Sequence, residues 1–69
     1  MWSLRAERAG VLPIEERYER QGTAYRRARQ LYMAGYGITA IQYSVEEPPR
    51  PVGVFTFDGI RFKRVPKGL

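Results

Sequence analysis

The residues best suited to chemistry are four cations near the C-terminal end of this 69-residue chain. No acidic residue follows Asp58, and the cations after it are Arg61, Lys63, Arg64 and Lys67. Arginine and lysine neutralise phosphate groups, and arginine also binds phosphate or carboxylate in a bidentate manner. The cluster therefore favours a surface for phosphate backbones. A charged edge strand that blocks sheet-to-sheet aggregation would give the same pattern.

A second, smaller basic patch is expected at Arg26 and Arg29, because residues three apart share one face of a helix. The chain carries a net charge of +5, and most of its twelve cations are arginine. Such a balance suits an anionic partner, either nucleic acid or an acidic host protein. A GC-rich genome would also enrich arginine, so composition alone does not choose between these explanations.

Catalysis is not expected. The chain contains neither histidine nor cysteine, which removes imidazole bases, thiolate nucleophiles, disulfides and the commonest transition-metal ligands. Its seven carboxylates form no recognisable catalytic pair, and its glycines do not follow a phosphate-binding loop pattern. We therefore predict no enzymatic activity, no catalytic residue, no metal site and no cofactor.

The first half of the chain predicts a strand followed by a helix within a single domain covering residues 1–69. Trp2 to Glu7 alternates apolar and polar residues with the period of a strand. Pro13 is placed to open a helix, and the spacing of Ile14, Tyr18, Tyr25, Ala28 and Tyr32 is helical, with Ala24 and Leu31 beside this face. The helix is expected to continue to Gly35, although Gly22 could divide it. The tyrosine stripe is expected to face the core; an exposed row would instead stack bases or form an oligomer seam.

The second half predicts three strands. Ile38 to Val45 is rich in β-branched residues, and the proline-rich segment from Glu46 to Pro51 is a stiff connector. Strands at Val52 to Phe57 and Ile60 to Val65 then form a hairpin around Asp58-Gly59, a strong hairpin signal.

A two-residue turn at Asp58-Gly59 would fix which residues face each other. Phe55 would lie opposite Phe62 on a side that packs against the helix. On the other side Thr56 would lie opposite Arg61 and Val54 opposite Lys63. The hairpin would then have an apolar back and a cationic front.

These observations predict an α+β fold, in which one long helix packs on a small antiparallel sheet in the order β-α-β-β-β with a C-terminal β-hairpin. The predicted function is a non-enzymatic regulatory module that binds nucleic acid mainly through the phosphate backbone. The predicted contacts are Arg61, Lys63, Arg64, Lys67, Arg26 and Arg29.

The alternative is a protein-binding inhibitor of a host enzyme such as a polymerase or defence nuclease. In size and composition the chain is similar to accessory proteins of phages and mobile elements. No segment has the length and apolarity of a signal peptide or membrane span, so we predict a cytoplasmic protein. A homodimer formed through an open edge strand is a third hypothesis.

Overall fold

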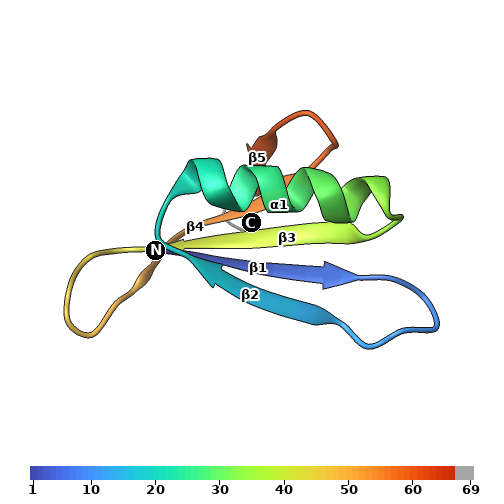
Figure 1. The fold of residues 1–69 in the computed structure, drawn as a ribbon. Helices are drawn as coiled ribbons and strands as arrows, with labels where there is room; N and C mark the ends of the chain where they lie inside the picture. Colours follow the sequence, from blue (N-terminus) through green and yellow to red (C-terminus); the bar gives the residue numbers. More distant parts are fainter. Residues whose placement is uncertain (67–69) are drawn as a thin grey trace.

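One helix and five strands make up the computed structural model, which describes residues 1–66. The strands form one antiparallel sheet in the order β2-β1-β3-β4-β5, and the helix lies along one of its faces, as Figure 1 shows. The predicted α+β class is therefore confirmed. The elements are β1 (Trp2–Glu7), β2 (Ile14–Tyr18), α1 (Gln21–Met33), β3 (Gly37–Tyr43), β4 (Pro51–Phe57) and β5 (Phe62–Arg64).

The predicted start of the helix at Pro13 is wrong, because the first residues assigned to it form strand β2. Ile14 and Tyr18 are four residues apart, which suits both a helical face and alternate positions of a strand. In the structure Ile14, Glu16 and Tyr18 point to the helix side of the sheet, while Glu15 and Arg17 are exposed on the other side. The helix is consequently 13 residues long, and Gly22 lies in its first turn.

Strand β2 pairs with β1, and β3 pairs with the other side of β1. Because β2 and β3 are both antiparallel to β1, they run in the same direction, and α1 crosses over β1 to connect them. The sheet therefore differs from the predicted one by an additional hairpin, β1–β2, which precedes the helix.

The predicted helix end at Gly35 is confirmed. Gly35 has a φ of +92°, a conformation that glycine adopts without steric cost. Its N–H bonds the carbonyl of Tyr32, and the N–H of Tyr36 bonds the carbonyl of Leu31. This pair of bonds is a Schellman motif, which satisfies carbonyls at the end of α1.

The core lies between α1 and the central strands. Ala24, Ala28 and Leu31 are the buried helix residues, and their spacing defines the inner face of α1. They pack in one cluster with residues from three strands: Trp2, Leu4, Ala6, Ile38, Ala40 and Phe57. Alanine at two of the helix positions lets the helix backbone approach the sheet closely.

The predicted tyrosine stripe is displaced to the flank of α1 that faces β4 and β5. Tyr25 is half-buried, and its ring packs edge-on against Phe57 and Phe62. Tyr32 is 43% exposed and also packs edge-on against Phe57. The tyrosines therefore connect the helix to the C-terminal hairpin rather than forming the centre of the core.

The C-terminal hairpin exists, but its predicted register is wrong by two residues. Phe57 pairs with Phe62 and Phe55 with Arg64, so residues 58–61 form a four-residue loop. A shift of two keeps every side chain on its own face of the sheet. The prediction that the phenylalanines lie on the side of the hairpin facing the helix is therefore correct. Phe57 is 6% exposed on this side, where Phe55 and Phe62 are half-buried.

Candidate nucleic-acid interface

The structure separates the predicted basic cluster of the hairpin. Arg61 lies in the 58–61 loop and not on the strand face shared with Lys63. Lys63 is exposed on the sheet face opposite the helix, where its ammonium lies 3.3 Å from a carboxylate oxygen of Asp58. Arg64 points to the helix side, as neighbouring strand residues alternate. Lys67 lies outside the described residues.

Arg26 and Arg29 are exposed on the outer surface of α1, as expected. Arg29 lies one turn after Tyr25 and three residues before Tyr32, so these three side chains share one flank of the helix. The same flank contacts the 58–61 loop: the Tyr25 hydroxyl donates a 2.6 Å hydrogen bond to the carbonyl of Ile60. Arg29 therefore lies on the side of the helix next to the loop that carries Arg61.

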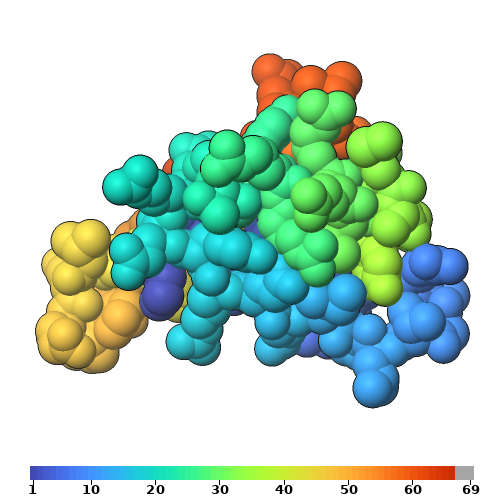
Figure 2. Space-filling view, in the orientation of Figure 1, coloured from blue at the N-terminus to red at the C-terminus, as the bar shows by residue number. Residues whose placement is uncertain are grey.

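The space-filling view shows that α1 and the loop between β4 and β5 are neighbours on the surface. In Figure 2 the segment between β4 and β5, in orange and red, stands beside α1, in green, at the top of the molecule. The contact is close, since a Cβ added at Gly59 would lie 2.6 Å from the Tyr32 ring. We call Arg26, Arg29 and Arg61 the basic ridge.

The side chain of Asp58 holds the loop of the ridge in shape. One of its carboxylate oxygens accepts hydrogen bonds from the backbone N–H groups of Arg61 (2.9 Å) and Ile60 (2.8 Å). These bonds, with a smaller contribution from Lys63, lower the pKa of Asp58 from 3.8 to about 2. Asp58 is therefore ionised at neutral pH and fixes the backbone from which Arg61 projects.

Carboxylates neutralise other cations but not the basic ridge. Arg5, Arg27, Arg50 and Lys63 each lie within 4.0 Å of an acidic side chain. Within residues 1–66, Arg26, Arg29 and Arg61 have no such partner, and the same holds for Arg17 and Arg20 before the helix. Arg8 and Arg64 also have no such partner among these residues, but the unpaired arginines that lie on adjoining elements are those of α1 and the 58–61 loop.

Arg27 shows why sequence spacing alone misjudges the helix charges. Its guanidinium donates to both carboxylate oxygens of Glu16 on β2, at 2.8 and 3.1 Å. These bonds lower the pKa of Glu16, as does a hydrogen bond donated by the Tyr18 hydroxyl. The three arginines that lie close together in the helix sequence therefore differ in their contacts. Arg27 binds the sheet, whereas Arg26 and Arg29 face outward.

The sheet face opposite the helix is uncovered within the described residues. Ile41 and Val54 pair across β3 and β4, and the N–H of Val65 bonds the carbonyl of Val54. Val54 and Val65 are about two-fifths exposed, at 40% and 39%. Around β4 and β5 this face carries apolar residues and the Asp58-bound Lys63, and the unpaired Arg17 lies on the same face at strand β2.

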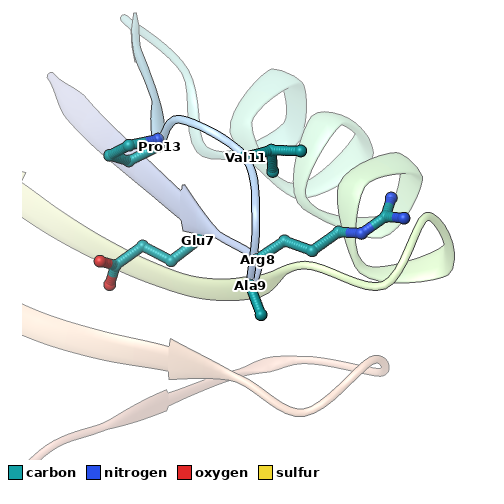
Figure 3. Close-up of a pocket in the computed structure, with 5 residues that line it drawn as sticks. All are labelled: Glu7, Arg8, Ala9, Val11 and Pro13. Carbon is teal, nitrogen blue, oxygen red and sulfur yellow. The ribbon is translucent and has the colours of Figure 1, made fainter.

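A shallow hollow lies at the loop between β1 and β2, lined by Glu7, Arg8, Ala9, Val11 and Pro13. Figure 3 shows Glu7 and Arg8 pointing away from each other, with Arg8 directed toward the end of α1. There its guanidinium donates a 3.0 Å hydrogen bond to the carbonyl of Ala34 and lies over the ring of Tyr36. Arg8 thus stabilises the helix end and leaves the hollow without a converging set of polar groups.

Comparisons of the chain with protein-family models, curated proteins and solved structures find no match. Among residues 1–66, no group of three or more histidine, cysteine or acidic side chains is placed to hold a metal ion. The helix in this part of the chain is too short and too polar to cross a membrane. The predicted lack of enzymatic activity and of a cofactor stays a prediction.

Proposed function

We propose that this protein is a non-enzymatic module that binds nucleic acid mainly through the phosphate backbone, with the basic ridge as its principal contact. The observation that supports the proposal is the distribution of ion pairs. Within the described residues, carboxylates neutralise Arg5, Arg27, Arg50 and Lys63, whereas Arg26, Arg29 and Arg61 are unpaired and exposed on adjoining elements.

The geometry of the ridge suits a backbone more than a single small anion. Its cations come from a helix and a loop joined by Tyr25 and Tyr32, so the loop is held against the helix before any ligand arrives. Guanidinium groups on a fixed support lose little freedom when they bind phosphate. Contacts of this kind position a nucleic acid without reading its sequence.

The test is the salt dependence of binding to oligonucleotides, measured for the wild type and for R26A/R29A/R61A. Each lost phosphate contact should reduce the slope of log K against log salt by about 0.9 on duplex DNA or about 0.7 on a single strand, so the triple variant should lose up to about 2.7 or about 2.1 from the slope. The matched control is R50A, which removes an arginine that is paired with Glu46 in a distant loop. Absence of salt-sensitive binding by the wild type would reject the proposal.

The alternative function, inhibition of a host enzyme by binding an acidic surface on it, would use the same cations. An affinity capture from cells, with and without nuclease treatment, separates the two. Nucleic-acid binding predicts that captured material is lost after nuclease digestion. Retention of one protein through nuclease and a high-salt wash would favour the inhibitor instead, and sedimentation at several concentrations would detect a homodimer.

A further inference from the structure

The Arg64 guanidinium packs at the edge of a cluster of aromatic rings. Its guanidinium carbon lies 5.1 Å from the centre of the Phe55 ring, and Nη1 donates to the carbonyl of Val52 at 3.3 Å. Phe55 in turn lies 5.2 Å from Trp2, which stacks on Phe62 with ring centres 5.5 Å apart. Phe55 and Phe62 are themselves 6.3 Å apart, so the three rings form a compact cluster, and the Arg64 guanidinium lies at its edge on the helix side of β4 and β5.

Gly53 makes room for this arrangement. A Cβ at this position would lie 3.0 Å from Nη1 of Arg64 and 3.0 Å from Cε1 of Phe55. Contacts this short force one of the two groups to move. The glycine therefore allows the guanidinium and the ring to sit above the backbone of β4.

A hollow of about 300 Å³ adjoins Arg64. Arg64 is its one charged lining residue among the described part of the chain; the others are Pro51, Val52, Gly53, Val54, Val65 and Pro66. No carboxylate within residues 1–66 lies within 4.0 Å of the Arg64 guanidinium. An apolar hollow beside an unpaired guanidinium suits a flat ring that belongs to an anionic molecule, since nucleobases stack on arginine planes as well as on aromatic rings.

We propose that this hollow receives an unstacked nucleobase, and that the nucleic acid bound by this protein is single-stranded. The inference rests on the proposed function, because the Arg64 side chain lies on the same side of the sheet as the basic ridge, although Val54 and Val65 line the hollow from the opposite face. Tyr25 links them: its hydroxyl donates a hydrogen bond to the 58–61 loop, and its ring packs edge-on against Phe62 of the aromatic cluster. A duplex keeps its bases stacked inside the helix, so only a single strand, loop or frayed end presents a base to the hollow.

The experiment compares single-stranded and duplex oligonucleotides of one length, as DNA and as RNA, for the wild type, R64K, R64A and G53A. Stacking of one base typically changes affinity by about 5- to 150-fold. R64K keeps the charge but loses the planar group, and G53A crowds the Arg64 guanidinium and the Phe55 ring without removing either. Both should weaken single-strand binding about tenfold and leave the much weaker duplex binding nearly unchanged.

The control is K63A, which removes a cation from the adjacent residue on the opposite face of the sheet. Single-strand binding by R64K and G53A at wild-type strength would overturn the base site while leaving phosphate binding intact. Duplex binding as tight as single-strand binding would overturn it as well. If the wild type bound no nucleic acid at all, both this inference and the proposed function would be rejected. Thermal unfolding of each variant distinguishes loss of the site from loss of the fold.

Discussion

Arg27 of the helix donates hydrogen bonds to both carboxylate oxygens of Glu16, 11 residues earlier on an edge strand. The pair joins α1 to β2, which otherwise meets the helix only through half-buried side chains. Its side chains are 33% and 29% exposed, so water partly screens the interaction.

Replacing Arg27 with methionine, which keeps much of the aliphatic stem, should lower the free energy of unfolding by about 0.5–1 kcal/mol. A double-mutant cycle with E16Q measures the coupling through denaturant titrations of the four proteins. We expect a coupling of the same size. Strictly additive effects of the two substitutions would show that the pair does not hold the helix to the strand.

Acid should destabilise the protein through Asp58 and Glu16. Both carboxyl pKa values are lowered in the folded state, to about 2 for Asp58, whereas unfolded carboxyls titrate near 4. The ionised forms therefore add stability that is fully present above about pH 5, and this stability is lost as the pH falls toward 2.

The check is the unfolding free energy of the wild type and D58N between pH 2 and pH 6. D58N retains an oxygen that can accept the bonds from Ile60 and Arg61 but cannot titrate, so its stability should depend less on pH in the acid range. E47Q, which changes an exposed acid in the proline-rich loop, serves as the control. If the unfolding free energies of D58N and the wild type changed in parallel with pH, Asp58 would not be a source of the acid sensitivity.

Two glycines should respond to alanine in opposite directions. Gly59 has a φ of +98°, and an added Cβ would lie 2.6 Å from the Tyr32 ring, so G59A should cost about 1–3 kcal/mol. Gly22 lies in the helix with open space around its Cα, so G22A should stabilise the protein by about 0.5–1 kcal/mol. Thermal unfolding of both variants provides the comparison. A G59A protein as stable as the wild type would mean that the loop does not press against the helix.

The Tyr25 hydroxyl should hold the 58–61 loop, which carries Arg61 of the basic ridge, against the helix. Y25F keeps the ring contacts with Phe57 and Phe62 but loses the bond to the Ile60 carbonyl, and should cost about 0.5–1.5 kcal/mol. Hydrogen exchange of the 58–61 loop amides should become faster in Y25F. Y43F, which alters a tyrosine on β3, is the matched control. Unchanged exchange in the loop would argue that packing alone holds it.

Local patterns in the sequence were sufficient for several parts of the fold. Alternation predicted β1, the glycine at position 35 predicted the helix end, and the proline cluster predicted the break before β4. The alternation of Phe55 and Phe57 placed the aromatic side of the hairpin correctly even though the register was wrong, because a shift of two residues preserves the face.

The parts that failed depend on side-chain hydrogen bonds that the pattern of apolar and polar residues does not indicate. Glu16 is a charged residue on the inner side of a strand, where Arg27 and the Tyr18 hydroxyl donate hydrogen bonds to its carboxylate; without the partner on the helix the segment from Ile14 is as compatible with a helix. Asp58 enlarges the expected two-residue turn by accepting bonds from Ile60 and Arg61. Of the candidate site residues, the helix pair Arg26 and Arg29 was placed correctly on an outer face, whereas Arg61 and Lys63 do not share a surface.

The packing of Trp2 against Phe55 and Phe62 has an optical consequence. Trp2 is the chain's single tryptophan and is 6% exposed, so its indole emission originates from one apolar environment. A fluorophore one ring away from Arg64 reports events at the hollow without any attached dye. The intensity and wavelength of Trp2 emission therefore allow binding at the hollow to be followed by titration of the unmodified protein.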